Sequence, residues 1–330
     1  MEYLIPLPSL LLFILAILSS MLTTRLFSSF FRGRGFVGID IFKTHRPKVP
    51  LLGGLSIPLT IVIFSILGYL TGLSGWRESL VVVLVTSILT LVGLLDDFRD
   101  VSGLYKPVAC LLGGLPIILL HTYTPHLDFP FGVGFRITII YMLMIPLGIS
   151  VASNTVNMLD VINGLVATAG IIVLSVMALA IYILGMDGNI YLIMIGIAAL
   201  IGFLYHNKYP AKTFLGNAPA LVIGGYIGTL AIMYHIEFPT VVAMFPFIHN
   251  SFFFLNKIRG FVEHKQLNLK VTELDHEGLI HDARDEKAPI TLLRFIVSRD
   301  PLSEPDAYLN IVILFIFSGL LALISCFLMG

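Results

Sequence analysis

The sequence predicts an all-α polytopic integral membrane protein with about ten transmembrane helices. Of its 330 residues, 57% are hydrophobic and only 12% are charged. Its mean hydropathy of +0.95 lies far from the average of soluble domains. Apolar runs recur along the whole chain, and several reach the ~17 residues that a helix needs to cross a hydrocarbon core about 30 Å thick.

Each predicted helix is a run of predominantly apolar residues. In chain order the ten runs cover 5–25, 51–72, 79–95, 107–121, 135–151, 166–185, 190–206, 218–235, 239–255 and 308–328. The first run lacks a basic leading region, so we expect a retained helix and not a cleaved signal peptide. The run 107–121 is short enough that tilting, or burial among its neighbours, is the alternative to a full span.

One long polar stretch, at about 256–307, separates the ninth run from the tenth. We expect a cytoplasmic loop that contains short helices or a strand pair, within a single transmembrane catalytic domain that covers residues 1–330.

The positions of the basic residues predict the topology. One set of alternating loops holds 18 of the 20 Lys and Arg residues, and the other set holds only Arg77 and Arg136. Because cytoplasmic loops carry the excess of Lys and Arg, this asymmetry predicts an even number of helices, with both termini exterior or lumenal. The polar clusters described below then lie on the cytoplasmic side.

Charge and cysteine content exclude several classes of function. The formal net charge is zero, so nothing indicates a nucleic-acid partner. Both cysteines, Cys110 and Cys326, fall inside predicted helices, which excludes a disulfide framework and a thiolate metal cluster. Ionisable residues near a membrane are costly unless they are paired or functional, so the polar clusters are where chemistry is expected.

The first two clusters flank the second and third helices. The first contains Lys43, His45, Arg46, Lys48, Pro50, Gly53 and Gly54, and alone it is typical of a topology signal or an anionic-lipid contact. The second is Asp96-Asp97-Phe98-Arg99-Asp100, followed by Lys106. Carboxylates at the end of a helix oppose its macrodipole. A solvated helix end is one interpretation, and a divalent-metal or phosphate site with Lys106 as a phosphate ligand is the other.

The third cluster places Asn154, Asn157, Asp160 and Asn163 at steps of three residues, directly before Gly164. Steps of three drift by about 60° on a helix, so the four side chains cannot share one straight face and a broken helix is implied. Their oxygen atoms suit Mg²⁺, and the amides can recognise a base or a sugar. Capping and turn formation is the alternative interpretation.

Two further clusters complete the set. The fourth extends from His206 to Asn217, and the fifth is Glu263-His264-Lys265-Gln266 in the long loop.

Together the five clusters resemble, in order and along nearly the whole chain, the polyprenyl-phosphate N-acetylhexosamine-1-phosphate transferases. This family contains the bacterial lipid I translocase and the eukaryotic enzyme that starts dolichol-linked oligosaccharide assembly. Asp96 and Asp97 resemble the family's paired aspartates, and the segment from Asn154 to Gly164 resembles its nucleotide and metal motif.

The resemblance implies a role for each candidate residue. The catalytic candidates are Asp96, Asp97 and Lys106; the substrate-binding candidates are Lys43, Asn154, Asp160, Asn163, Gly164, His264 and Lys265; the metal ligands are Asn157 and Asn217. The sequence departs from the family in two places. Asn217 stands where an aspartate usually binds magnesium, and Glu263 replaces the first basic residue of a basic-His-basic trio. The multi-histidine run of the bacterial branch is missing.

The resemblance implies transfer of GlcNAc-1-phosphate, or of a related HexNAc-1-phosphate, from a UDP-sugar to a dolichyl-type polyprenyl phosphate, with release of UMP. Mg²⁺ is the implied cofactor, with Mn²⁺ as the alternative, and a homodimer is left open. The setting is an archaeal or bacterial cell membrane or the endoplasmic reticulum. The runner-up is a lipid I translocase that uses UDP-MurNAc-pentapeptide and undecaprenyl phosphate. A transporter or a non-enzymatic lipid-binding protein would be the rival from another class.

Overall fold

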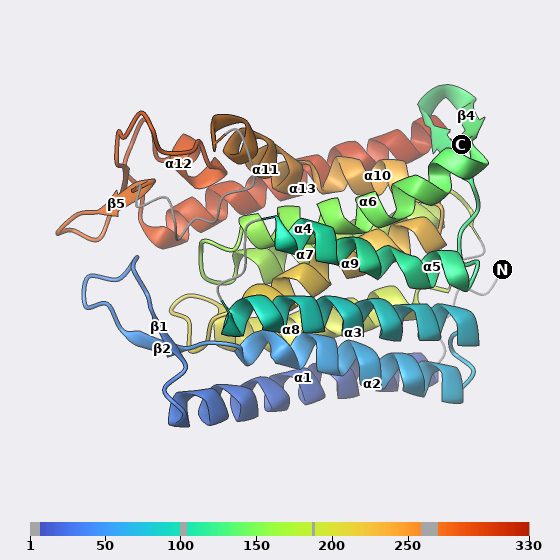
Figure 1. Cartoon of the computed structure of the whole chain (residues 1–330), viewed down its shortest axis with the longest axis horizontal. Coiled ribbons are helices and arrows are strands. Elements are labelled where there is room, and N and C mark those ends of the chain that lie inside the picture. Colours follow the sequence, from blue (N-terminus) through green and yellow to red (C-terminus); the bar gives the residue numbers. More distant parts are fainter. Residues whose placement is uncertain (1–6, 100–103, 187–188, 259–269, 330) are drawn as a thin grey trace.

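The computed structural model describes residues 7–99, 104–186, 189–258 and 270–329. Most of them form helices that lie roughly side by side along the long axis of the molecule (Figure 1). The longer helices are α1 (Leu7–Gly33), α2 (Ser56–Leu70), α3 (Trp76–Phe98), α6 (Thr138–Met158), α7 (Leu165–Ile183), α8 (Tyr191–Asn207), α9 (Asn217–Met233), α11 (Phe245–Ile258) and α13 (Glu304–Met329). The short ones are α4 (Tyr105–Cys110), α5 (Leu115–Leu119), α10 (Glu237–Ala243) and α12 (Leu292–Ile296).

The predicted polytopic, helical membrane architecture is confirmed. Among the described residues, six helices are long and apolar enough to cross a membrane, and the α10–α11 pair passes the same test as one bent span. Three shorter apolar helices cover Tyr105–Leu119, Tyr191–Asn207 and Asn217–Met233. Each of the ten predicted runs therefore contains helix, although the number that crosses a bilayer stays a prediction.

Two predicted runs are broken helices. The run 107–121 is divided into α4 and α5 by a 3₁₀ turn, Leu111–Gly114, where a Cβ on Gly114 would lie 2.5 Å from the Cα of Pro146 in α6. The run 239–255 is two helices bent by 67°. Pro246 follows this bend, and a proline cannot donate the hydrogen bond that would continue the preceding helix.

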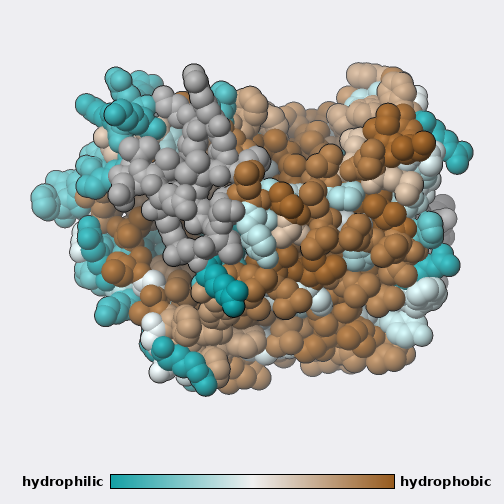
Figure 2. All heavy atoms as spheres, viewed as in Figure 1, coloured by the Kyte–Doolittle hydropathy of each residue, from teal (hydrophilic) through white to brown (hydrophobic). Residues whose placement is uncertain are grey.

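The most buried helix, α9, lies in the interior of the bundle against α3 and α6. A Cβ on Gly93 of α3 would overlap Ala218 of α9, and a Cβ on Gly224 of α9 would overlap Ala152 of α6. Small residues at these contacts allow the backbones to approach closely, as in other membrane helix pairs. The bundle surface is apolar: Figure 2 shows hydrophobic side chains across the middle of one face and hydrophilic residues toward its ends.

Three short hairpins lie at the ends of the bundle. At one end, which we call the polar end, are the hairpins β1 (Val37–Ile39) with β2 (Lys48–Pro50) and β5 (Thr272–Leu274) with β6 (Ile280–Asp282), together with α12 (Figure 1). The opposite end carries the hairpin β3 (His126–Phe129) with β4 (Val133–Arg136). The predicted polar loop therefore contains both a strand pair and a short helix in its described part.

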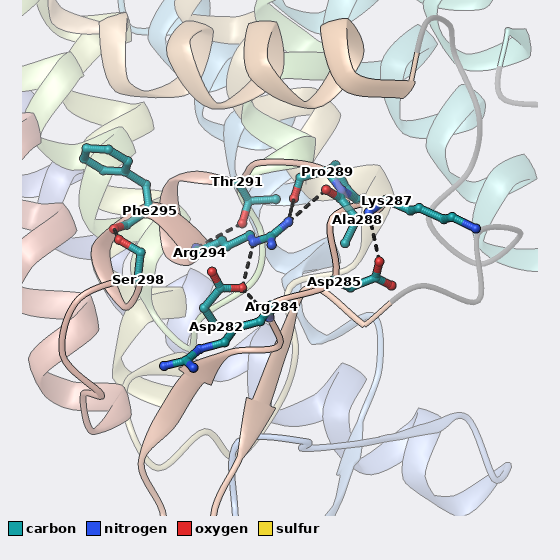
Figure 3. A network of polar contacts seen from close by, with 10 residues as sticks. All are labelled: Asp282, Arg284, Asp285, Lys287, Ala288, Pro289, Thr291, Arg294, Phe295 and Ser298. Carbon is teal, nitrogen blue, oxygen red and sulfur yellow. Dashed lines mark hydrogen bonds and ion pairs between the residues drawn. The ribbon is translucent and has the colours of Figure 1, made fainter.

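A network of polar contacts joins residues 282–298 at the end of this loop to one another (Figure 3). The Arg294 Nε donates to Asp282 Oδ1 at 2.8 Å, and its Nη1 donates to the carbonyl oxygen of Ala288 at 2.9 Å. The buried Asn250 of α11 then joins two elements: its Oδ1 accepts from the N–H of Leu292, and its Nδ2 donates to the carbonyl oxygen of Met158 at the end of α6. The loop is thus fastened to the helix that carries the asparagine motif.

Candidate active site

The candidate residues that the structure describes meet at the polar end of the bundle. They come from the end of α3, from α4, from the end of α6 and the turn after it, and from the start of α9. His264 and Lys265 lie outside the described residues, so their predicted roles in substrate binding stay predictions.

The Asp97 carboxylate lies at the N-terminus of α9. Its Oδ1 accepts the N–H of Asn217 at 3.2 Å, and its Oδ2 accepts the N–H of Ala218 at 3.1 Å. Gly216, with φ of +93°, turns the chain into this helix. The start of a helix carries partial positive charge and N–H groups without intrahelical partners. The macrodipole of α9 therefore offsets the unfavourable position of Asp97 at the end of α3.

Asp96, the other member of the pair, is buried and bonded to Lys106. The Lys106 Nζ lies 2.8 Å from Asp96 Oδ2, and the lysine side chain is 16% exposed. The structure therefore brings together the predicted catalytic residues of α3 and α4. A lysine that remains partly accessible while paired with a buried carboxylate is held in one position, which suits a point-charge contact with phosphate.

The asparagine turn, which we define as residues 159–164, separates α6 from α7. Gly164 adopts a left-handed conformation with φ of +77° and precedes the first residue of α7. The predicted break in the helix is therefore present. Before the break, the Asn154 Nδ2 donates to the carbonyl oxygen of Ser150 in α6, and the side chain lies beside Cys110 of α4.

Asp160 is exposed to solvent in this turn. The surrounding protein nevertheless desolvates its carboxylate, and the nearby Asp97 charge adds repulsion, so that the pKa of Asp160 rises to about 7. The carboxylates of Asp97 in α3 and Asp160 in the turn are therefore close enough to repel each other.

Asn163 and Gly164 are buried and held by other segments. The Asn163 Nδ2 donates to Asp40 Oδ2 at 2.9 Å, and its backbone N–H donates to Glu304 Oε1 at 3.3 Å. The Gly164 N–H donates to Asn207 Oδ1 at 3.0 Å. Asp40 and Glu304 therefore hold Asn163, and Asn207 holds Gly164.

Lys43, predicted to bind substrate, is also buried. Its ammonium forms ion pairs with Asp40, at 3.3 Å, and with Glu304. Its hairpin is joined to the loop before α9, because Pro50 O accepts the N–H of Phe214 at 2.9 Å and the Thr213 hydroxyl at 3.1 Å. The first and fourth polar clusters therefore form one unit.

The sequence alone did not assign roles to Asp40, Asn207, Asn250 or Glu304. Each has at least one partner that lies far away in the chain: Glu304 and Lys43 are separated by 261 positions. The only signal available was a carboxylate in the residues just before the tenth apolar run, which is too common to indicate a site.

The donor atoms at the polar end fit Mg²⁺. The described residues contain no group of three or more His, Cys, Asp or Glu side chains arranged to hold a metal ion. Amide oxygens are also magnesium ligands, however. The Asn217 side chain bonds to the Asp97 carboxylate, and the Asp160 carboxylate is close enough to Asp97 to repel it. Repulsion between two carboxylates is what a bound cation relieves, so the mixed acid and amide set suits this ion.

Comparisons with known proteins agree with the resemblance seen in the sequence. Residues 79–235, which include Asp97, Asp160 and Asn217, match the family described as glycosyl transferase family 4. A protein of Saccharolobus solfataricus, provisionally named UDP-N-acetylglucosamine:dolichyl-phosphate N-acetylglucosaminephosphotransferase, is 35% identical over 203 residues, which are 60% of this chain and 62% of that protein.

A protein of Sulfolobus acidocaldarius with the same name is 36% identical over 60% of this chain and 63% of its own length. A phospho-N-acetylmuramoyl-pentapeptide-transferase of Streptococcus pneumoniae is 29% identical over 61% of this chain and 64% of that enzyme. The match thus spans less than two thirds of the length of each of these relatives. The paired aspartates, the asparagine turn and the N-terminus of α9 all lie inside the matched region, so the similarity to glycosyl transferase family 4 covers the described part of the candidate site.

Proposed function

We propose that this protein transfers GlcNAc-1-phosphate from UDP-GlcNAc to a dolichyl-type polyprenyl phosphate and releases UMP. The observation that carries the proposal is the meeting of Asp97, Asp160 and the Asp96–Lys106 pair at the polar end of an apolar helical bundle. A lipid phosphate has its charged head at such an interface and its chain among apolar helices. The names of the two relatives from Saccharolobus and Sulfolobus specify these two substrates.

The reaction exchanges one phosphorus–oxygen bond for another. An oxygen of the lipid phosphate bonds to the sugar-bearing phosphorus of UDP-GlcNAc, while the bond from that phosphorus to the bridging oxygen breaks and UMP leaves with the electron pair. A phosphate monoester has its second pKa near 6, so the acceptor is already largely ionised at neutral pH. Asp97 therefore serves to position groups and to tune charge more than to remove a proton.

The residues of this chain divide the remaining work. Lys106, held by Asp96, contacts phosphate oxygens. Asp97, Asn157, Asp160 and Asn217 would hold the magnesium ion. When bound, Mg²⁺ supplies positive charge to the diphosphate and to the departing UMP. The resemblance assigns recognition of the UDP-sugar to Asn154, Asn163 and Gly164, and also to Lys43, His264 and Lys265.

The topology that we infer has ten spans, with the polar end cytoplasmic and both termini exterior or lumenal. Arg77 and Arg136, the two basic residues of the minority set, lie at the start of α3 and in β4. Asp96 and Asp97 lie in the last turn of α3, so one helix length separates them from Arg77. This separation supports the assignment of sides made from the sequence. A homodimer in the membrane stays a prediction.

The second candidate is a lipid I translocase, which the Streptococcus pneumoniae relative favours. The absence of a multi-histidine run from the sequence argues for the GlcNAc enzyme. A transporter is disfavoured, because the substrate sites of transporters lie near the bilayer midplane, whereas these polar side chains gather at one end of the bundle.

A substrate matrix tests the proposal. Purified protein receives radiolabelled UDP-GlcNAc, UDP-GalNAc or UDP-MurNAc-pentapeptide, each with dolichyl or undecaprenyl phosphate and Mg²⁺. We expect labelled lipid and an equal amount of UMP from UDP-GlcNAc with dolichyl phosphate. Labelled lipid from UDP-MurNAc-pentapeptide, and from neither of the other two donors, would select the second candidate. Absence of lipid product and of UMP from every pair would refute both.

A further inference from the structure

Three ionisable side chains form a buried cluster beside the asparagine turn. Asp40 and Lys43 belong to the β1–β2 hairpin, and Glu304 is the first residue of α13. None of the three side chains is more than 7% exposed. The ring of Tyr209 lies 4.2 Å from the Lys43 ammonium and covers it from another direction.

The charges of this cluster do not balance. One ammonium faces two carboxylates, which leaves one excess negative charge in a buried position. Asn163 compensates for it, because its backbone N–H donates to Glu304 Oε1 and its side-chain Nδ2 donates to Asp40 Oδ2. Hydrogen bonds to buried carboxylates are stronger than those between neutral groups. The asparagine turn is therefore fastened to the cluster at two points.

Glu304 also lies at a junction in the chain. It ends the long polar loop and begins α13, so it is fixed to that helix and to Lys43 at the same time. The residue that it holds, Asn163, is three positions after Asp160 and directly before Gly164. Displacement of Glu304 would release one end of the turn that carries these groups.

We propose that Glu304 is a positioning residue, which holds the Asn163–Gly164 backbone in the conformation that binds the UDP-sugar. This role rests on the proposed function, since the turn is assigned to the nucleotide sugar there. Glu304 acts through Asn163 and is not a group that touches the reacting phosphates.

Three variants separate positioning from general stability. Glu304→Ala removes the acceptor of the Asn163 N–H, whereas Glu304→Gln retains an oxygen acceptor of the same length without the charge. Asp306→Asn is the matched control, because Asp306 lies in the same first turn of α13, is exposed and bonds to Ser303. Steady-state kinetics with UDP-GlcNAc, the Kd of UMP and hydrogen exchange of the peptide 159–165 are measured for each.

For Glu304→Ala we expect the KM for UDP-GlcNAc and the Kd of UMP to rise about tenfold, with kcat changed less than threefold and faster exchange in the peptide 159–165. Glu304→Gln should stay within threefold of the wild type, and Asp306→Asn should match it. A merely unstable protein would lose active fraction, which lowers kcat and leaves KM unchanged.

Two outcomes would overturn the positioning role of Glu304 and leave the proposed function standing. One is an active Glu304→Ala protein with the wild-type KM and UMP affinity, and the other is faster exchange in the turn without any change in KM. A wild type that neither turns over nor binds UMP would instead refute the proposed function, and the positioning role would fall with it.

Discussion

Replacement of Lys43 by Met should destabilise the protein strongly, and removal of one carboxylate should partly restore it. Met has a similar length and no charge, so Lys43→Met leaves Asp40 and Glu304 facing each other in a buried site without a cation. Breaking a buried ion pair by removing one partner costs about 3–5 kcal/mol. In Lys43→Met/Glu304→Gln the excess is again one negative charge, as in the wild type, so we expect the second substitution to recover at least ~1 kcal/mol.

Thermal melting of the four members of this cycle, in one detergent, measures the coupling. We expect the order wild type, Glu304→Gln, double variant and Lys43→Met, from most to least stable. Lys270→Met is the control, because Lys270 pairs with Glu273 at 3.2 Å on the exposed surface and its loss should leave the melting temperature unchanged. The reasoning is refuted if Lys43→Met melts like the wild type, or if the double variant is less stable than Lys43→Met.

The remaining predictions concern turnover, metal and topology. Asp97→Asn and Lys106→Ala should each lower kcat per folded enzyme at least about tenfold, equal to ~1.4 kcal/mol of transition-state stabilisation. Lys106→Ala also removes the cation paired with the buried Asp96 and should lower the melting temperature. Normal turnover in Asp97→Asn would move the active site elsewhere. Asn217→Ala should abolish activity while Asn217→Asp stays active and needs less Mg²⁺ for half-maximal rate; full activity of the alanine variant in a magnesium titration would exclude Asn217 as a ligand. A cysteine at the exposed position of Lys212 should react with an impermeant maleimide only from the cytoplasmic side, and one at Val133 only from outside; the reverse pattern would invert the topology.

Local sequence patterns predicted most of the helices, because an apolar run long enough for a bilayer has few other stable conformations. They did not predict where a run bends. Pro146 lies inside the continuous helix α6, whereas Pro246 follows the 67° bend between α10 and α11. A proline removes one hydrogen bond in both cases, and the tertiary packing decides whether the helix continues. Gly114 packs closely against Pro146 of α6.

The site was predictable to the extent that its residues occur in clusters. Asp96, Asp97 and the asparagine motif are dense polar groups in apolar surroundings, and the asymmetry of basic residues placed them at one end. Glu304 and Asn250 are single residues, and their importance comes only from distant partners, Lys43 and Met158. Such long-range pairs have no local signal, because the residues next to Glu304 or Asn250 in the sequence do not identify the distant partner.

The geometry of Asp97 gives a physical reason for an asparagine at position 217. Asp97 accepts the backbone N–H groups of Asn217 and Ala218, and the Asn217 side chain bonds to it as well. An aspartate at 217, which is usual in the family that the sequence resembles, would place a third carboxylate beside Asp97 and Asp160. Its repulsion would destabilise the metal-free site, while its charge would attract Mg²⁺ more strongly. The amide thus stabilises the site before the ion arrives, and it follows that Mg²⁺ should enter mainly together with the UDP-sugar, whose diphosphate supplies the negative charge that this chain lacks.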